Sequence, residues 1–88
     1  MILETTAFRL VEDADQEAFL QADKRVQTDV AYHQRGLLRR TTARSAEGEW
    51  MVVVLWDSPD AVVDLFAAEL SSYADAASVR AGRYETLD

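Results

Sequence analysis

Hydrophobic and polar residues follow one another along this chain in short segments, and their spacing predicts four strands and two helices. The clearest strand is 50–56, Trp-Met-Val-Val-Val-Leu-Trp, which has no charged side chain. Its β-branched and aromatic residues favour a strand over a helix. Because successive strand side chains point to opposite faces, Trp50 and Trp56 share one face and Met51 and Leu55 the other. Both faces of this strand therefore need cover.

Two segments have the three- and four-residue apolar spacing that is typical of amphipathic helices. The first begins at an expected N-cap, Asp13, with Gln16 at the capping-box position. It ends before Gly36, because glycine readily adopts the left-handed conformation of a helix C-terminus. The second begins at Ser58, with Pro59 at the first helical position. The apolar stripe of the first helix is Phe19, Ala22, Val26, Val30 and His33, and that of the second is Val62, Phe66, Leu70 and Tyr73.

Three further strands are expected over 5–12, 37–44 and 79–87, and residues 45–48 turn the second strand into 50–56 as a hairpin. The order β-α-β-β-α-β is that of the split βαβ, or ferredoxin-like, arrangement, and its class is α+β. The whole chain, 1–88, is expected to form one domain. Its two helices would cover one face of a four-stranded antiparallel sheet.

The other face of that sheet would be bare, and the composition helps to choose among three known uses of such a face. RNA-binding versions expose aromatic and basic residues there, but this chain has a net charge of −7, which opposes nucleic-acid binding. Metal-carrying versions need a Cys-x-x-Cys loop, and the chain has no cysteine. Face-to-face homodimerisation suits the two-sided strand best.

Composition also bears on location. A run of seven apolar residues is far too short to span a membrane. Residues 1–6 contain neither the basic region nor the cleavage-type site of a secretory signal, so a cytoplasmic protein is expected. Eight arginines against one lysine, with fourteen alanines, hint at a GC-rich bacterial source.

Three segments carry a resemblance to a known family: the helix entry 13–19, the basic stretch 33–40 with its Gly36 helix stop, and 50–61, where a Trp-terminated strand runs into a Ser-capped helix. In these segments the chain resembles the dimeric α+β barrel superfamily, especially its antibiotic-biosynthesis monooxygenase-like branch. The resemblance implies a homodimer whose two sheets form one barrel. It also implies a pocket for an apolar or aromatic ligand between the helices and the sheet of each subunit.

For function, the resemblance implies a small-molecule enzyme that oxygenates aromatic or polyketide-like substrates without a metal or an organic cofactor. The alternative is a non-catalytic homodimeric module that binds ligands or is structural, since one fold hosts many functions. Haem-cleaving members use an asparagine, a tryptophan and a histidine on the second helix. This chain has no asparagine, and its one histidine, His33, lies on the first helix, so haem cleavage is disfavoured.

Cofactor-independent oxygenation needs an apolar cavity, one base and a few hydrogen-bond donors. The expected catalytic base is His33, because histidine changes its protonation near neutral pH and His33 is in register with the apolar stripe, which would direct it toward the sheet. The alternative is a structural histidine, buried or half-buried, that is satisfied by a backbone carbonyl. The expected substrate-binding residues are Trp56, Phe66, Tyr73 and Tyr84. Core or interface packing is the alternative for the tryptophan, and a core aromatic ring with its hydroxyl at the surface is the alternative for the two tyrosines. One histidine without cysteine predicts no metal site.

Four arginines, Arg35, Arg39, Arg40 and Arg44, fall within ten positions that contain no acidic residue. They could bind an anionic ligand. Alternatively, 37–44 is an edge strand, where charged side chains discourage unwanted pairing, or the arginines pair with acidic residues of a partner subunit.

Overall fold

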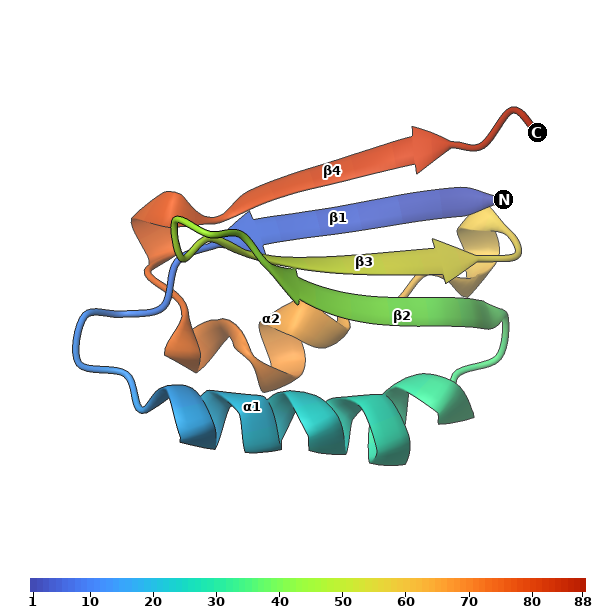
Figure 1. The fold of residues 1–88 in the computed structure, drawn as a ribbon. Helices are drawn as coiled ribbons and strands as arrows, with labels where there is room; N and C mark the ends of the chain where they lie inside the picture. Colours follow the sequence, from blue (N-terminus) through green and yellow to red (C-terminus); the bar gives the residue numbers. More distant parts are fainter.

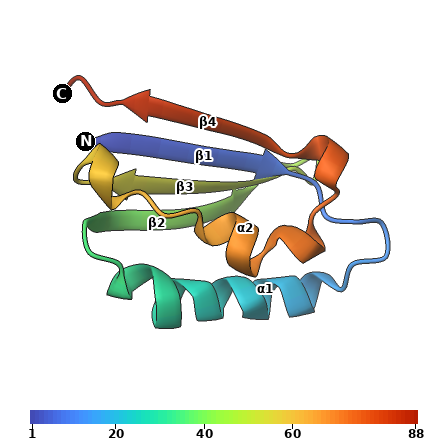
Figure 2. The same ribbon diagram turned by 180° about the vertical axis from the view of Figure 1, so that it is seen from behind.

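The computed structural model describes all 88 residues, and the predicted ferredoxin-like α+β fold is confirmed. Its strands are β1 (Ile2–Phe8), β2 (Leu37–Arg44), β3 (Trp50–Trp56) and β4 (Arg80–Glu85), and its helices are α1 (Gln16–Arg25) and α2 (Leu65–Glu69). The strands pair antiparallel in the order β2-β3-β1-β4. Both helices lie on one side of the sheet (Figures 1 and 2). None of the helices is long and apolar enough to cross a lipid bilayer.

The two hairpin strands β2 and β3 have the predicted bounds, whereas β1 and β4 differ from 5–12 and 79–87. β1 starts at Ile2 because it is a central strand that pairs with both β3 and β4 from its first residue. It ends at Phe8, and beyond it only Leu10 makes a single bridge, to Ala74. The N-terminal residues join the sheet through these long-range pairings, which local alternation does not reveal.

The first helix changes its hydrogen-bonding pattern after α1. Asp15, and not Asp13, caps it by accepting a hydrogen bond from the Ala18 N–H at 3.2 Å. A π-helical turn then follows at Val26–Val30, closed by the Ala31 N–H on the Val26 carbonyl. A π turn holds one extra residue, so Ala31 becomes fully buried.

The same extra residue moves His33 out of register with the apolar stripe. His33 ends a short 3₁₀ turn and is exposed. The prediction that its side chain points toward the sheet is therefore wrong, and so is the alternative of a buried histidine.

The second predicted helix is broken into short pieces. Pro59–Ala61 form a single 3₁₀ turn that the Ser58 side chain does not cap, and Val62 has an extended backbone. Asp64 caps α2 instead, accepting a hydrogen bond from the Ala67 N–H at 2.9 Å. The branched side chains of residues 62 and 63 disfavour a helix, so this segment passes below the sheet in extended form.

Aromatic rings from the helix layer and the sheet interlock in the core. The Phe19 ring of α1 lies 5.7 Å from Phe8, 5.0 Å from Trp50 and 5.8 Å from Tyr73, centroid to centroid, in edge-on arrangements. Phe8 and Phe19 are fully buried. Trp50 and Trp56 are both buried on the helix side of the sheet, so core packing, and not the bare face, accounts for their burial.

No helix covers the opposite face of the sheet (Figure 1). The strand register places seven side chains there that are apolar or aromatic: Leu3, Ala7, Ala43, Met51, Val53, Leu55 and Tyr84. Met51 is 37% exposed and Tyr84 is 56% exposed. This open face is the bare face that the sequence predicts.

We expect Phe19→Ala to lower the free energy of unfolding by about 3–5 kcal/mol, because it empties the centre of the aromatic cluster. The neighbouring Leu20, 37% exposed, is a matched control, and Leu20→Ala should lower it by less than about 1 kcal/mol. Urea unfolding followed by tryptophan fluorescence measures both. Equal losses would contradict the placement of Phe19 at the centre of the core.

Candidate active site

A cavity of about 390 Å³ lies between the helix-side face of the sheet and the segment 62–66. Cavities that bind small molecules span about 300–1,000 Å³, and this one falls within that range. Its apolar walls are Val52, Val54, Trp56, Val62, Val63, Leu65, Phe66 and Ala81, and the charged side chains that line it are Glu4, Arg40, Asp64 and Arg83.

The structure brings two of the five predicted site residues to this cavity. Trp56 and Phe66 line it from the sheet and from α2, respectively. Tyr73 instead packs into the aromatic core, and Tyr84 lies on the open face of the sheet. His33 is exposed, makes no side-chain hydrogen bond within the chain and does not line the cavity. The catalytic role of His33 stays a prediction.

Glu4 is a carboxylate at the cavity that the sequence pattern did not single out. Its Oε1 accepts a hydrogen bond from Trp56 Nε1 at 3.1 Å, and its Oε2 accepts a longer one from Arg83 Nη2 at 3.4 Å. The Glu4 side chain is 28% exposed. An oriented carboxylate beside apolar walls can take a proton from a bound molecule, so Glu4 is a candidate base.

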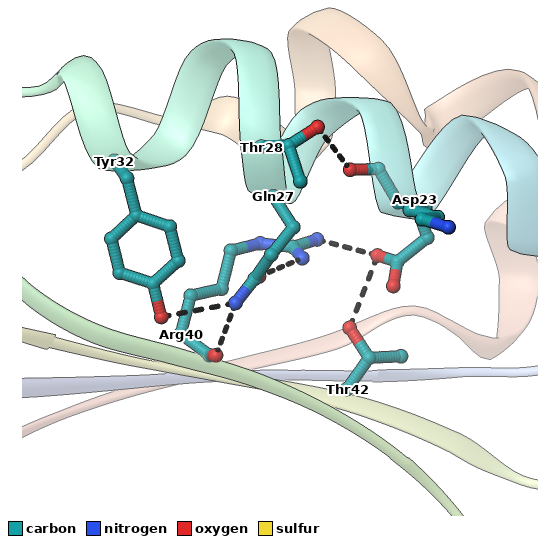
Figure 3. Close-up of polar contacts among 7 residues, drawn as sticks. Asp23, Gln27, Thr28, Tyr32, Arg40 and Thr42 are labelled. Carbon is teal, nitrogen blue, oxygen red and sulfur yellow. Dashed lines mark hydrogen bonds and ion pairs between the residues drawn. The ribbon is translucent and has the colours of Figure 1, made fainter.

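Arg40 is the only polar or charged residue of the chain that is buried, with 3% of its surface exposed. It reaches from the edge strand β2 to α1, as Figure 3 shows. Its Nη2 donates to Asp23 Oδ1 at 2.6 Å and its Nη1 to Gln27 Oε1 at 2.9 Å. Thr42 also donates to Asp23 Oδ1, at 3.0 Å, and Gln27 Nε2 donates to the Arg40 carbonyl, at 3.0 Å. The guanidinium is thus held from two sides.

The strand register aligns Glu4 and Arg40 across the sheet. Both residues pair with Val54, Glu4 from β1 and Arg40 from β2. Their backbones are therefore two strand spacings apart, about 10 Å, with Val54 between them. Glu4 and Arg40 thus flank Val54 on the helix-side face of the sheet, and all three residues line the cavity.

The other arginines of the run 35–44 do not join Arg40. Arg35, Arg39 and Arg44 are exposed, and the Arg44 guanidinium lies 5.4 Å from the centre of the Trp50 ring. β2 is an edge strand, as predicted, which agrees with the edge-protection interpretation for its exposed arginines. The run is not one anion-binding cluster, because Arg39 lies on the open face of β2 whereas Arg40 and Arg44 lie on the helix-side face. No group of three or more His, Cys, Asp or Glu side chains is placed to hold a metal ion.

We expect Asp23→Ala to lower the free energy of unfolding by about 3–5 kcal/mol, because it leaves the buried Arg40 guanidinium without its partner. The exposed pair Arg80–Glu49, at 2.7 Å, is the matched control. Glu49→Ala should lower the free energy of unfolding by less than about 1 kcal/mol. Chemical denaturation of both variants measures the difference, and a small loss for Asp23→Ala would argue against a fixed buried pair.

Comparisons with known proteins bear on the fold. No protein-family model matches the sequence, and no curated protein matches it. Solved structures do match. The cofactor-independent oxygenase SnoaB from Streptomyces nogalater has a TM-score of 0.77 and 15% identity, over 99% of this chain and 93% of that chain. Rv0793 from Mycobacterium tuberculosis has a TM-score of 0.74 and 16% identity, over 99% and 95%.

A third match is a protein from Bordetella bronchiseptica provisionally described as an antibiotic biosynthesis monooxygenase, with a TM-score of 0.67 and 16% identity over 98% of this chain and 96% of that chain. At such low identity a structural likeness establishes the fold and not the activity. The predicted resemblance is thereby confirmed for the fold: the chain has the fold of the antibiotic-biosynthesis monooxygenase-like proteins.

Proposed function

We propose that this chain is a cytoplasmic, homodimeric enzyme that oxygenates an aromatic or polyketide-like substrate without a cofactor. The observation that carries the proposal is the cavity above Val54, which combines apolar walls with charged residues and has Glu4 and Arg40 on opposite sides of Val54. The fold likeness to SnoaB, a cofactor-independent oxygenase, supports the same reaction class.

The chemistry asks for few groups from the protein. An electron-rich phenol or enol loses a proton to a base, and the resulting anion reacts with O₂ at carbon. A CH₂ group and O₂ then give a C=O group and H₂O, so the substrate supplies the electrons. The protein must exclude water, accept the proton and stabilise the negative charge on the substrate oxygen.

The residues of the cavity can fill these roles. Glu4 is the proposed base, and the Trp56 indole N–H orients its carboxylate. Phe66 and the apolar side chains of β3 would pack against the substrate ring. A purely structural module would need no such cavity, whereas a ligand-binding module without catalysis would keep the cavity and show no turnover.

We expect Glu4→Gln to lower the rate of oxygenation at least about 100-fold, because it removes the base and keeps the shape of the side chain. Anthrone is a suitable probe, since its oxygenation to anthraquinone consumes one O₂ and releases one H₂O. Oxygen uptake and anthraquinone absorbance report the rate. Glu12→Gln, an exposed carboxylate outside the cavity, is the matched control and should behave like the parent protein.

His33→Ala tests the base that the sequence predicts, in the same assay. Because His33 lies outside the cavity, we expect this variant to keep its activity. Loss of turnover in His33→Ala together with full activity in Glu4→Gln would reverse the two assignments. Binding of anthrone without any oxygen uptake would favour the non-catalytic module.

The homodimer is proposed from the open face of the sheet, where a second copy would cover the apolar side chains of β1 and β3. We expect the chain to sediment at twice its mass of 9.9 kDa. Met51→Glu should shift it to monomer, because a charge placed in an apolar interface loses its hydration. Gln21→Glu, exposed on α1, is the matched control, and a monomeric parent protein would refute the dimer.

A further inference from the structure

We propose that Arg40 forms an oxyanion subsite in the cavity, and that the bound ligand is an aromatic molecule with an anionic oxygen. This inference deepens the proposed function, on which it rests for the location of the site. It names the end of the cavity that would recognise the ligand and the chemical class that would fit there.

The first observation is that Arg40 keeps a free donor. A guanidinium has five N–H groups, and the Arg40 hydrogen bonds to Asp23 and Gln27 use only Nη1 and Nη2. Its Nε–H has no partner within the chain. No buried polar side-chain atom of the chain lacks a partner, so this Nε is not sealed in the core. The space that Arg40 lines is the cavity.

The second observation is that Arg40 is held before any ligand arrives. Asp23 is itself fixed by the Thr42 hydroxyl, and Gln27 bonds both the guanidinium and the Arg40 carbonyl (Figure 3). A buried ion pair is seldom more stabilising than apolar side chains of the same volume. Stability alone is therefore a weak reason for a buried arginine, whereas a fixed donor beside a cavity is what oxyanion recognition requires.

The third observation concerns the acids around the cavity. Glu4 accepts hydrogen bonds from Trp56 and Arg83. Asp64 accepts from the N–H at the start of α2, and Asp23 accepts from Arg40 and Thr42. Each carboxylate thus has a donor already, while Arg40, and the more exposed Arg83, retain donors that are unused. Charge-assisted hydrogen bonds of this kind are stronger than neutral ones.

The register gives the ligand its orientation. Because Arg40 and Glu4 flank Val54 on neighbouring strands, a flat ring above Val54 would place its anionic oxygen at Arg40 and its reacting carbon on the side of Glu4. The anionic oxygen can belong to a carboxylate that the ligand carries, or to the phenolate or enolate that forms on deprotonation. Both present the same chemistry to Arg40.

Calorimetric titration with 2-naphthoate and 2-naphthamide, which differ in charge and share one ring system, tests the carboxylate source. We expect the parent protein to bind the acid at least about tenfold more tightly than the amide. Arg40→Gln should abolish this preference. Arg39→Gln should keep it, because Arg39 is exposed and is not among the residues that line the cavity.

The double variant Asp23→Asn/Arg40→Gln guards against unfolding, since it removes both charges of the ion pair and keeps polar side chains of similar shape. Its circular dichroism shows whether it is folded. It should also bind acid and amide equally. Equal binding by the parent protein, or no binding of either probe, overturns the proposal. A preference that survives in both Arg40 variants also overturns it, because Arg83 would then be the group that recognises the anion.

4-Nitrophenol tests the phenolate source, since its phenolate absorbs visible light and its neutral form does not. An increase in phenolate absorbance on binding, lost in the Arg40 variants, supports an oxyanion formed from the substrate hydroxyl. A response to 2-naphthoate alone supports a carboxylate on the ligand. Failure of the oxyanion subsite can be distinguished from failure of the oxygenase function, because the preference for 2-naphthoate over 2-naphthamide is measured without turnover. A protein with this preference and no oxygen uptake keeps the subsite and loses the oxygenase function.

Discussion

The ion pair between Arg40 and Asp23 joins the edge strand β2 to α1, and the same arginine lines the cavity. At the Phe8–Trp50 end of the sheet, the ring of Phe19 fills the space between the layers. Toward the Trp56 end no aromatic side chain of α1 fills this space, and Arg40 with its polar partners spans it instead. The layers are therefore closely packed at one end and enclose a cavity toward the other.

Some of this architecture was predictable from sequence. Strand 50–56 is apolar on both faces and is preceded by a turn segment with Gly48. The bounds predicted for these two strands therefore agree with those of β2 and β3 in the structure. The helices were less predictable, because the 3.6-residue period assumes a regular helix. The π turn at Val26–Val30 adds one residue to the first helix. The extended backbone of Val62 interrupts the second segment, which its apolar stripe predicts as one continuous helix.

The candidate site was only partly predictable, for two physical reasons. Glu4 lay outside the expected strand 5–12, and its long-range pairings with Val54 and Arg83 place it in the sheet. Arg40 was hidden in a run of arginines, although strand alternation alone separates it from Arg39. The first helix held a further signal, because Asp23 and Gln27 are four residues apart and therefore share a face. Two polar residues placed in this way can together bind one side chain from a neighbouring element.

The fold itself leaves the chemistry open, since folds of this kind carry unrelated activities. What distinguishes this chain is the set of side chains around Val54 and not the arrangement of strands. At about 15% identity to its structural neighbours, function has to be argued from those side chains.

The position of Val54 between Glu4 and Arg40 has a consequence for substrate selection. The spacing of the Glu4 and Arg40 backbones is set by strand pairing across β1, β3 and β2, so side-chain changes elsewhere in the cavity would leave that spacing largely intact. The thickness of the ring that fits above the sheet depends, in contrast, on the side chain at position 54. Length and thickness of the ligand are thus controlled by separate parts of the molecule, and a change in one need not disturb the other.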